Sequence, residues 1–346
     1  MESVVDRCVR LRSIQLSTIY KTHCEAAAPM ELSMSRSTFP GASISSHLAR
    51  ELRISRSRTL GRNPFPGALV NGCGGTLHGI AATASADSCA DMSQQKSRIE
   101  FPPELNPEVM PKHVALILDG NNRYSKARGV RGSECFEVGL KKSLKEAVRV
   151  SVDWGIEILT LFYFSYDNWN REKVEVDTIF GLFEMYLIEY REAVMRYNIQ
   201  FSVMGTLERF PETLQKLVAE VTEESRNNKG LKVVVAAGYG GRQDILQATQ
   251  RIAQLVANKE LSIDEITLDE FESHLMTKYM NPSNVDLMIR TSGEQRVSNF
   301  LLWQMAWTEF VFLKENWPEF RRDSMKNALI SYQSRDRRLG LRKTKF

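Results

Sequence analysis

The sequence predicts an α/β fold, a single domain with a mostly parallel six-stranded sheet flanked by helices, and three observations carry this prediction. Short apolar runs alternate along the chain with longer segments whose apolar residues recur at helical spacing. Most of these runs end in a cluster of glycine and polar residues, as strands do at the carboxyl edge of an open sheet. After residue 100 only Cys135, His113 and His274 remain, so neither a disulfide scaffold nor a zinc site is expected there.

Length and composition narrow the choice of partners. The 346 residues, 42% of them hydrophobic, suffice for one large domain or two ordinary ones with a proper core. A net charge of +4 is small for this length, and we expect no nucleic-acid partner. No window approaches the apolar length of a membrane span, so no transmembrane segment is expected. The partners should be small and anionic.

Residues 1–95 differ from the rest of the chain. They contain scattered serine and arginine, few acidic residues and no sustained period. This composition is typical of a disordered organellar transit peptide, and the abundance of serine favours import into a plastid, with the mature protein in the chloroplast stroma. A disordered regulatory tail is the alternative.

From Pro102 onward the pattern becomes regular, and the elements can be assigned in order. Strands are expected at residues 114–118, 158–164, 199–204, 231–237, 285–289 and 309–313. Helices are expected at residues 138–152, 174–197 and 211–225, and after Gly241. Strands separated by helices favour a parallel sheet with right-handed crossovers.

The first strand and the turn after it organise the chain. Residues 114–118 are apolar, as in a strand buried on both faces, and Asp119-Gly-Asn-Asn ends the strand. Free backbone N–H groups and Arg123 suit a phosphate, whereas Asp119 repels one unless a cation lies between them. The turn therefore predicts a diphosphate bridged by Mg²⁺. An ordinary strand-to-helix turn with Asp119 as the N-cap is the alternative.

Other charged residues follow the later strands. Because the carboxyl ends of parallel strands share one edge, Asp119, Ser165, Tyr239 and Arg290 should converge there. The charged residues expected at this edge are Arg123, Arg171, Arg242, Arg290, Arg296, Asp119, Asp167, Glu294 and Glu309. Arginine forks bind phosphate oxygens, and neighbouring carboxylates can share Mg²⁺ with those phosphates. Structural ion pairs are the alternative. The Walker sequence GxxxxGK[ST] does not occur.

Aromatic residues lie close in sequence to these clusters. They are Phe162, Tyr163, Phe164, Trp169, Trp303 and Trp307. Their position suits a substrate with an anionic head and a hydrocarbon tail. For any one of them, ordinary core packing is the alternative.

Four motifs together resemble the cis-prenyltransferases, the undecaprenyl and dehydrodolichyl diphosphate synthase family. The first is His113-Val-Ala-Leu-Ile-Leu-Asp-Gly-Asn-Asn-Arg123, and the others occupy residues 164–171, 239–244 and 286–304. The resemblance covers about residues 105–340, including the terminal Arg338-Leu-Gly340. It implies a catalytic domain over 105–340 with a hydrophobic tunnel, Mg²⁺ as cofactor, isoprenyl diphosphates as ligands and a homodimer.

The resemblance also assigns roles to residues of this chain. Asp119 would hold Mg²⁺ and orient the leaving diphosphate of the allylic substrate, which Gly120, Asn121, Asn122 and Arg123 would cradle. The diphosphate of isopentenyl diphosphate would bind Arg290, Arg296 and Ser298, with Glu309 helping to place its metal. A third group would lie between the two substrates and consists of Ser165, Asn168, Trp169 and Arg171. Asn168 would assist proton loss.

The chain also departs from the family pattern. Gly132 and Phe136 stand where the family has an arginine and a histidine near the allylic diphosphate. Further replacements are Asn122 for glycine, Tyr124 for tryptophan and Asp167 for glutamate. Tyr163 stands where long-chain synthases carry a small residue, so its ring should close the tunnel after one or two additions. Alternatively the ring of Tyr163 turns into the core and the tunnel stays open.

The resemblance leads to one expected reaction and three alternatives. We expect a short-chain cis-prenyl diphosphate synthase that condenses dimethylallyl diphosphate with isopentenyl diphosphate to a C10–C20 Z-prenyl diphosphate. The altered allylic site also suits head-to-middle coupling of two dimethylallyl diphosphates, as in lavandulyl diphosphate synthase. A longer-chain polyprenyl diphosphate synthase and a non-catalytic partner subunit are the remaining alternatives.

Overall fold

The computed structural model describes residues 100–337. The predicted transit peptide at 1–95 and the Arg338-Leu-Gly340 segment lie outside the described residues.

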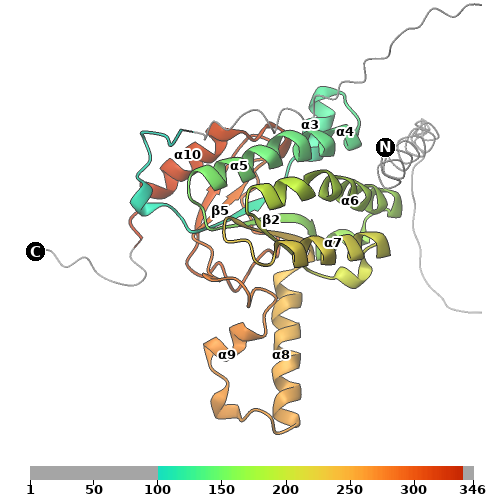
Figure 1. The fold of residues 1–346 in the computed structure, drawn as a ribbon, viewed down its shortest axis with the longest axis vertical. Coiled ribbons are helices and arrows are strands. Elements are labelled where there is room, and N and C mark those ends of the chain that lie inside the picture. The colour runs from blue at the N-terminus through green and yellow to red at the C-terminus, as the bar shows by residue number, and fades with distance from the viewer. Residues whose placement is uncertain (1–99, 338–346) are drawn as a thin grey trace, which may run out of the picture. The chain divides into compact units, whose positions relative to one another are not determined.

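Within residues 100–337, six strands form one parallel sheet (Figure 1). In their order across the sheet they are β3 (Gln200–Met204), β4 (Lys232–Tyr239), β2 (Ile158–Ser165), β1 (His113–Ile117), β5 (Leu287–Arg290) and β6 (Glu309–Phe312). Every neighbouring pair is parallel. The predicted six-stranded parallel sheet is confirmed, and β1 and β2, which both end in clusters of polar residues, lie side by side at its centre.

Helices connect the strands. They are α3 (Asn121–Arg128), α4 (Gly132–Val138), α5 (Lys145–Asp153), α6 (Lys173–Arg196), α7 (Glu212–Ser225), α8 (Gly241–Ala257), α9 (Leu268–Ser273) and α10 (Arg322–Gln333). The helix expected at 138–152 begins earlier, because a π-helical segment at Gly139–Leu144 joins α4 to α5. The sequence offered α3 only through the alternative of a strand-to-helix turn, since none of its residues is buried and an apolar stripe is lacking. A helix does follow the turn, but its N-cap is Gly120 and not Asp119.

The sheet buries apolar side chains on both faces because successive strand residues point to opposite sides. One face packs against helices, and its core contains Val114 and Leu116 with Ala147 of α5, Phe180 of α6, Leu214 of α7 and Met325 of α10. The other face carries Ala115 and Ile117 and packs against the segment that holds Phe300 and Leu301. The polar edge of β1 is therefore rigidly supported from both sides.

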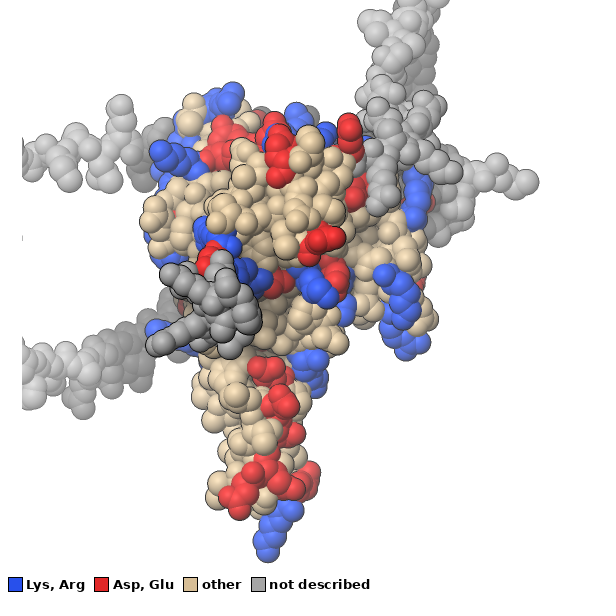
Figure 2. Space-filling model, turned by 90° about the vertical axis from the view of Figure 1, so that its left-hand side faces the viewer, with Lys and Arg blue, Asp and Glu red and all other residues tan. Residues whose placement is uncertain are grey.

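Helices α8 and α9 project from the sheet as an arm (Figure 1). The arm exposes apolar side chains, including Ile263 and Leu268, which are 74% and 70% exposed. Acidic side chains also gather on the arm, whereas the rest of the face in Figure 2 carries both signs of charge. In the described part of the chain, no helix is both long and apolar enough to cross a bilayer.

Candidate active site

Asp119 lies at the carboxyl edge of the sheet, just past the end of β1. Ile117, the last residue of β1, pairs with Phe162 of β2 and Arg290 of β5. The chain then turns at Gly120, whose φ of +106° favours glycine. A Cβ at Gly120 would also come within 2.5 Å of the Asn316 side chain. The turn therefore needs glycine, and it starts α3 directly beside the Asp119 carboxylate.

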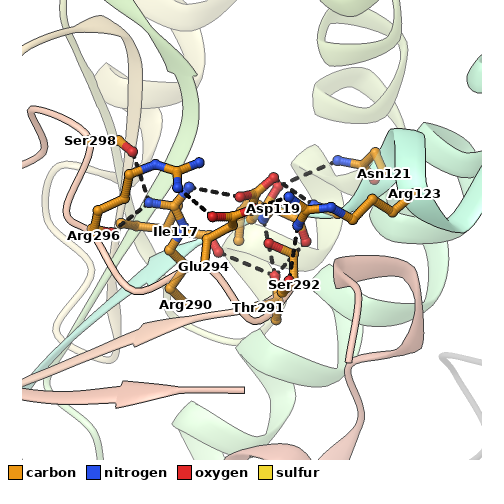
Figure 3. Close-up of polar contacts among 12 residues, drawn as sticks. Ile117, Asp119, Asn121, Arg123, Arg290, Thr291, Ser292, Glu294, Arg296 and Ser298 are labelled. Carbon is orange, nitrogen blue, oxygen red and sulfur yellow. Dashed lines mark hydrogen bonds and ion pairs between the residues drawn. The ribbon is translucent and has the colours of Figure 1, made fainter. Parts of the chain in front are cut away.

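Arg290 and Asp119 form an ion pair between the ends of neighbouring strands (Figure 3). Nη2 of Arg290 lies 2.7 Å from Oδ2 of Asp119. Nη1 of the same guanidinium donates to the Arg296 carbonyl at 2.5 Å and to Oγ of Ser298 at 2.8 Å. The structure thus brings Asp119, Arg290 and Ser298 together, as the sequence led us to expect.

The environment of Asp119 favours its charged form. Burial disfavours ionisation, but the hydrogen bond and positive charge of Arg290 and the Gly120 N–H outweigh it and hold the pKa of Asp119 below its ordinary value. The Gly120 N–H donates to Oδ1 of Asp119 at 2.7 Å. Asp119 is therefore an anionic oxygen donor at neutral pH.

Glu294 joins two further arginines at this edge (Figure 3). One of its oxygens pairs with Arg123 of α3 and the other with Arg296 of the loop after β5. Hydrogen bonds from Arg296 and Arg123 hold the pKa of Glu294 below its ordinary value. Both guanidinium groups are at least half exposed. Together with the ion pair above, three arginines face two carboxylates, which leaves positive charge for an anionic ligand.

The amino end of α3 adds donors to the site. No side chain caps the helix at Gly120, and its first turn, with Asn121 and Asn122, contains no acidic residue. The first N–H groups of such a helix favour an anion. Nδ2 of Asn121 donates to the Leu118 carbonyl at 3.4 Å, while its Oδ1 is buried without a hydrogen-bond partner in residues 100–337. This oxygen lies next to Gly139 at the start of the π-helical segment.

The chemistry of these groups fits Mg²⁺ held together with phosphate. No cluster of three or more histidine, cysteine, aspartate or glutamate residues occurs in the described range, so the protein does not form a complete metal cage there. Magnesium usually binds one or two carboxylates and completes its coordination with water and substrate phosphates. Asp119, beside the amino end of α3, could hold the ion in this way.

A second group of candidate residues follows β2, the neighbour of β1. Oδ1 of Asn168 accepts from the Ser165 N–H at 3.0 Å, and Oγ of Ser165 accepts from the Asp167 N–H at 3.2 Å. Arg171 donates to Glu175 at 2.8 Å. These bonds fix the loop, and the register of β2 places it on the same edge as Asp119.

Trp169 belongs to an aromatic cluster rather than to an open surface. Its ring stacks on Phe180 with centroids 5.0 Å apart and contacts Phe164, and Nε1 donates to Thr206 at 3.0 Å. The guanidinium of Arg209 covers the ring at 4.2 Å. Core packing accounts for these contacts of Trp169.

Glu309 does not lie where we expected it. It is the first residue of β6 and pairs with Leu287 of β5. Leu287 precedes Arg290 by about three residues, or roughly 10 Å along the strand. The Glu309 carboxylate binds Nη1 of Arg335 at 2.7 Å. Glu309 therefore sits at the opposite edge, and within one chain it cannot ligate the same cation as Asp119.

The Tyr163 side chain points from β2 to α6. Its hydroxyl donates to the Ile179 carbonyl at 2.8 Å, and its ring lies 5.0 Å from that of Phe183. Tyr163 and Phe136 are both partly buried against the helix-covered core. The ring of Tyr163 therefore bridges the space between β2 and α6, while the tunnel itself stays a prediction.

Sequence reasoning missed two residues that fix Asp119. The Trp317 N–H donates to the Asp119 carbonyl at 2.9 Å, and the Thr291 hydroxyl contacts the same carbonyl at 2.6 Å. Nothing local in the sequence marks Trp317 as a neighbour of Asp119. Thr291 follows the predicted site residue Arg290 directly, so its position in the sequence could have indicated that it lies at the site.

Known proteins resemble this chain over most of its length. A family model described as putative undecaprenyl diphosphate synthase matches residues 117–340. Dehydrodolichyl diphosphate synthase 2 of Arabidopsis thaliana is 40% identical over 297 residues, which are 86% of this chain and 93% of that protein. A chloroplastic nerylneryl diphosphate synthase of Solanum lycopersicum is 45% identical over 237 residues, 68% of this chain and 73% of that protein.

A solved structure agrees with these relatives. The crystal structure of lavandulyl diphosphate synthase from Lavandula x intermedia, in complex with dimethylallyl diphosphate, superposes with a TM-score of 0.65 at 40% identity. The match covers 66% of this chain and 98% of that one. The parallel sheet and these matches define the class of the protein, a prenyltransferase. The chain belongs to the cis-prenyltransferases, the family of the putative undecaprenyl diphosphate synthases.

Proposed function

We propose that the protein condenses dimethylallyl diphosphate with isopentenyl diphosphate to a short Z-prenyl diphosphate of C10 to C20. The observation that carries this proposal is the pair of accessible guanidinium groups of Arg123 and Arg296, held by one carboxylate beside the Asp119–Arg290 ion pair. Two neighbouring cationic groups suit two diphosphates at one site. The supporting relatives include a nerylneryl and a (2Z,6Z)-farnesyl diphosphate synthase.

In this proposal each group has a role in the condensation. Arg123, Asn121, Asn122 and the amino end of α3 bind the allylic diphosphate, and Arg290, Arg296 and Ser298 bind that of isopentenyl diphosphate. Asp119 would hold Mg²⁺, which when bound would supply positive charge for the departing diphosphate. The allylic C–O bond breaks, the isopentenyl double bond attacks the allylic carbon, and a proton leaves to give the Z double bond. We assign Ser165 and Asn168 to the proton-loss step and Arg171 to the loop that holds them.

Tyr163 supports a short product. A phenol ring that spans from β2 to the Ile179 carbonyl of α6 occupies space that a growing hydrocarbon chain would need. Phe183 packs against that ring and supports its position. We therefore assign chain-length control to Tyr163.

A second candidate is head-to-middle coupling of two dimethylallyl diphosphates. It is favoured by the similarity to lavandulyl diphosphate synthase and by Gly132 and Phe136, which remove a cation and a polar group from the allylic side.

Incubation of the purified full-length protein with Mg²⁺ and either dimethylallyl diphosphate alone or both substrates separates the two candidates. After dephosphorylation, mass spectrometry should find C10 to C20 Z-alcohols only when isopentenyl diphosphate is present. A branched C10 alcohol from dimethylallyl diphosphate alone would establish the second candidate. Products longer than C20 would contradict both.

We propose further that the protein works in the plastid and as a homodimer. Chloroplastic relatives and the composition of residues 1–95 support the plastid location, and import of a fluorescent protein fused to residues 1–95 tests it.

The exposed apolar arm supports the homodimer, because Ile263 and Leu268 would be covered by another copy. Light scattering should give twice the chain mass, and Leu268→Glu should lower it.

A further inference from the structure

The hydroxyl of Thr291 contacts both backbone polar groups of Asp119. Oγ1 accepts from the Asp119 N–H at 3.0 Å and lies 2.6 Å from the Asp119 carbonyl, to which it donates. The Ile117 carbonyl lies 3.3 Å from the same oxygen. We propose that Thr291 is a positioning residue that sets the affinity of Asp119 for a divalent cation. The inference rests on the proposed role of Asp119 as the cation ligand.

The end of β1 explains why this residue needs a hydroxyl. The ladder between β1 and β5 stops at the pair of Ile117 and Arg290, and the chain turns away at Gly120. The peptide groups on either side of Asp119 therefore lose their regular partners in β5. Buried peptide groups without partners are costly. A hydroxyl, with one donor and two acceptor positions, can serve both groups at once.

Water is poorly placed to substitute for Thr291. The residue is 1% exposed and follows a strand buried along its whole length. The Trp317 N–H also binds the Asp119 carbonyl, at 2.9 Å, but the Asp119 N–H is left with only a 3.0 Å contact to the Ile117 carbonyl inside a tight turn. Loss of the hydroxyl therefore leaves the Asp119 N–H with the Ile117 carbonyl alone and the Asp119 carbonyl with the Trp317 N–H alone, which loosens the hold on this peptide.

Movement of this peptide would move the carboxylate. Oδ1 and Oδ2 of Asp119 are each held at 2.7 Å, by the Gly120 N–H and by Arg290. Arg290 is also held by the Arg296 carbonyl and by Ser298, so a shift of Asp119 changes its distance to Arg290 and to any ion beside it. Groups that orient a metal ligand typically change metal affinity or activity by about 10- to 100-fold when removed.

Thr308 provides a matched control. It is also buried, and its hydroxyl donates to the Val285 carbonyl at 2.6 Å. It lies immediately before β6, at the edge of the sheet opposite Asp119. Thr308→Val removes a buried hydroxyl of the same kind without touching the site.

The experiment compares Thr291→Val, Thr291→Ser and Thr308→Val in the full-length protein. Calorimetric titration of Mg²⁺ into protein saturated with dimethylallyl thiolodiphosphate, an unreactive analogue, gives the metal affinity directly. We expect Thr291→Val to weaken Mg²⁺ binding by about 10- to 100-fold, and to raise the Mg²⁺ concentration for half-maximal rate in parallel. Thr291→Ser should restore both, and Thr308→Val should lower only the unfolding temperature.

Several outcomes overturn the inference. They are unchanged Mg²⁺ affinity in Thr291→Val, equal losses in Thr291→Val and Thr291→Ser, and a loss in Thr308→Val as large as in Thr291→Val. If Thr291→Val does not fold, Thr291→Ala carries the same test, because it removes the hydroxyl and adds no bulk. Asp119→Asn separates the two proposals: wild-type Mg²⁺ affinity in that variant overturns the cation site itself, and the inference with it.

Discussion

Arg290 and Asp119 come from the carboxyl ends of two adjacent strands and form an ion pair in which the arginine is almost buried and the aspartate is one-third exposed. The partly exposed carboxylate of Asp119 can bind another ligand, whereas the buried guanidinium of Arg290 stays in place. A cation that approaches Asp119 must therefore compete with a fixed guanidinium, unless it arrives with an anion that Arg290 can bind in exchange. This relation favours joint binding of metal and diphosphate.

Asp119→Asn should lower the turnover rate by at least about 100-fold, because an amide keeps the shape of the side chain but loses the charge that attracts a cation. Steady-state rates with both substrates check this, and circular dichroism should show an unchanged fold. Asp177→Asn on α6, whose carboxylate pairs with Lys173 on the surface, is the control and should keep the wild-type rate. A near-normal rate in Asp119→Asn would count against the metal role.

Glu294→Gln should raise KM for both substrates by roughly two- to fivefold, with a smaller effect on kcat. A glutamine side chain is neutral and has one acceptor oxygen in place of two, so it holds both Arg123 and Arg296 less firmly. Initial rates measured while each substrate is varied in turn separate the two values. Glu224→Gln, which removes a partner of Arg191 between α6 and α7, should leave both unchanged. An increase for only one substrate would show that Glu294 does not position both arginines.

Tyr163→Ala should lengthen the product, because it removes the ring that spans from β2 to α6. Tyr163→Phe keeps the ring and loses only the hydrogen bond to Ile179, so its product should stay close to wild type. Mass spectrometry of the dephosphorylated products measures both. Tyr197→Ala at the exposed end of α6 is the control. Identical product spectra in all three variants would show that Tyr163 does not limit the length of the product.

His113 should make the protein less stable in acid. Burial lowers the pKa of its imidazole to about 4, and Nε2 accepts from Thr160 at 2.8 Å while Nδ1 donates to the Asn284 carbonyl at 3.2 Å. The unfolded chain, with a histidine pKa near 6.5, binds a proton that the folded chain does not. The free energy of unfolding should therefore fall as the pH drops from about 6.5 to about 4, by about 3 kcal/mol in all.

Urea unfolding of wild type and His113→Gln at about pH 7 and about pH 4 measures this contribution. The variant should be less stable at neutral pH, where it lacks the fitted imidazole, but should lose less stability on acidification. Parallel pH profiles for the two proteins would show that His113 is protonated equally in both states.

Local sequence was sufficient for the strands and for the residues that follow them directly. Asp119 and Arg290 could be assigned to one edge because each follows an apolar run, and parallel strands share their carboxyl edge. The same rule places Glu309, which begins the predicted strand, at the other edge of the sheet. Its proposed role beside Asp119 came from family analogy and not from the pattern of residues.

Contacts between distant segments could not be predicted. The bridge through Glu294 joins residues 171 apart, and Trp317 reaches Asp119 from beyond β6. Helix α3 could be given only as an alternative, because it buries none of its residues and so has no apolar period. Its existence depends on the turn at Gly120 and on neighbours such as Asn316, which pack against that turn only in the folded chain.

The π-helical segment at Gly139–Leu144 has a consequence for engineering this protein. It lets one continuous helical rod present Phe136 before the segment and Ala147 and Val150 after it to the same core. Deletion of a single residue there, with a return to ordinary winding, would leave the downstream residues facing nearly the same way, because the wider π-helical turn accommodates one more residue than an ordinary turn. Ala147 and Val150 would then still face the sheet, so this segment should tolerate the loss of one residue better than an ordinary α-helical segment would.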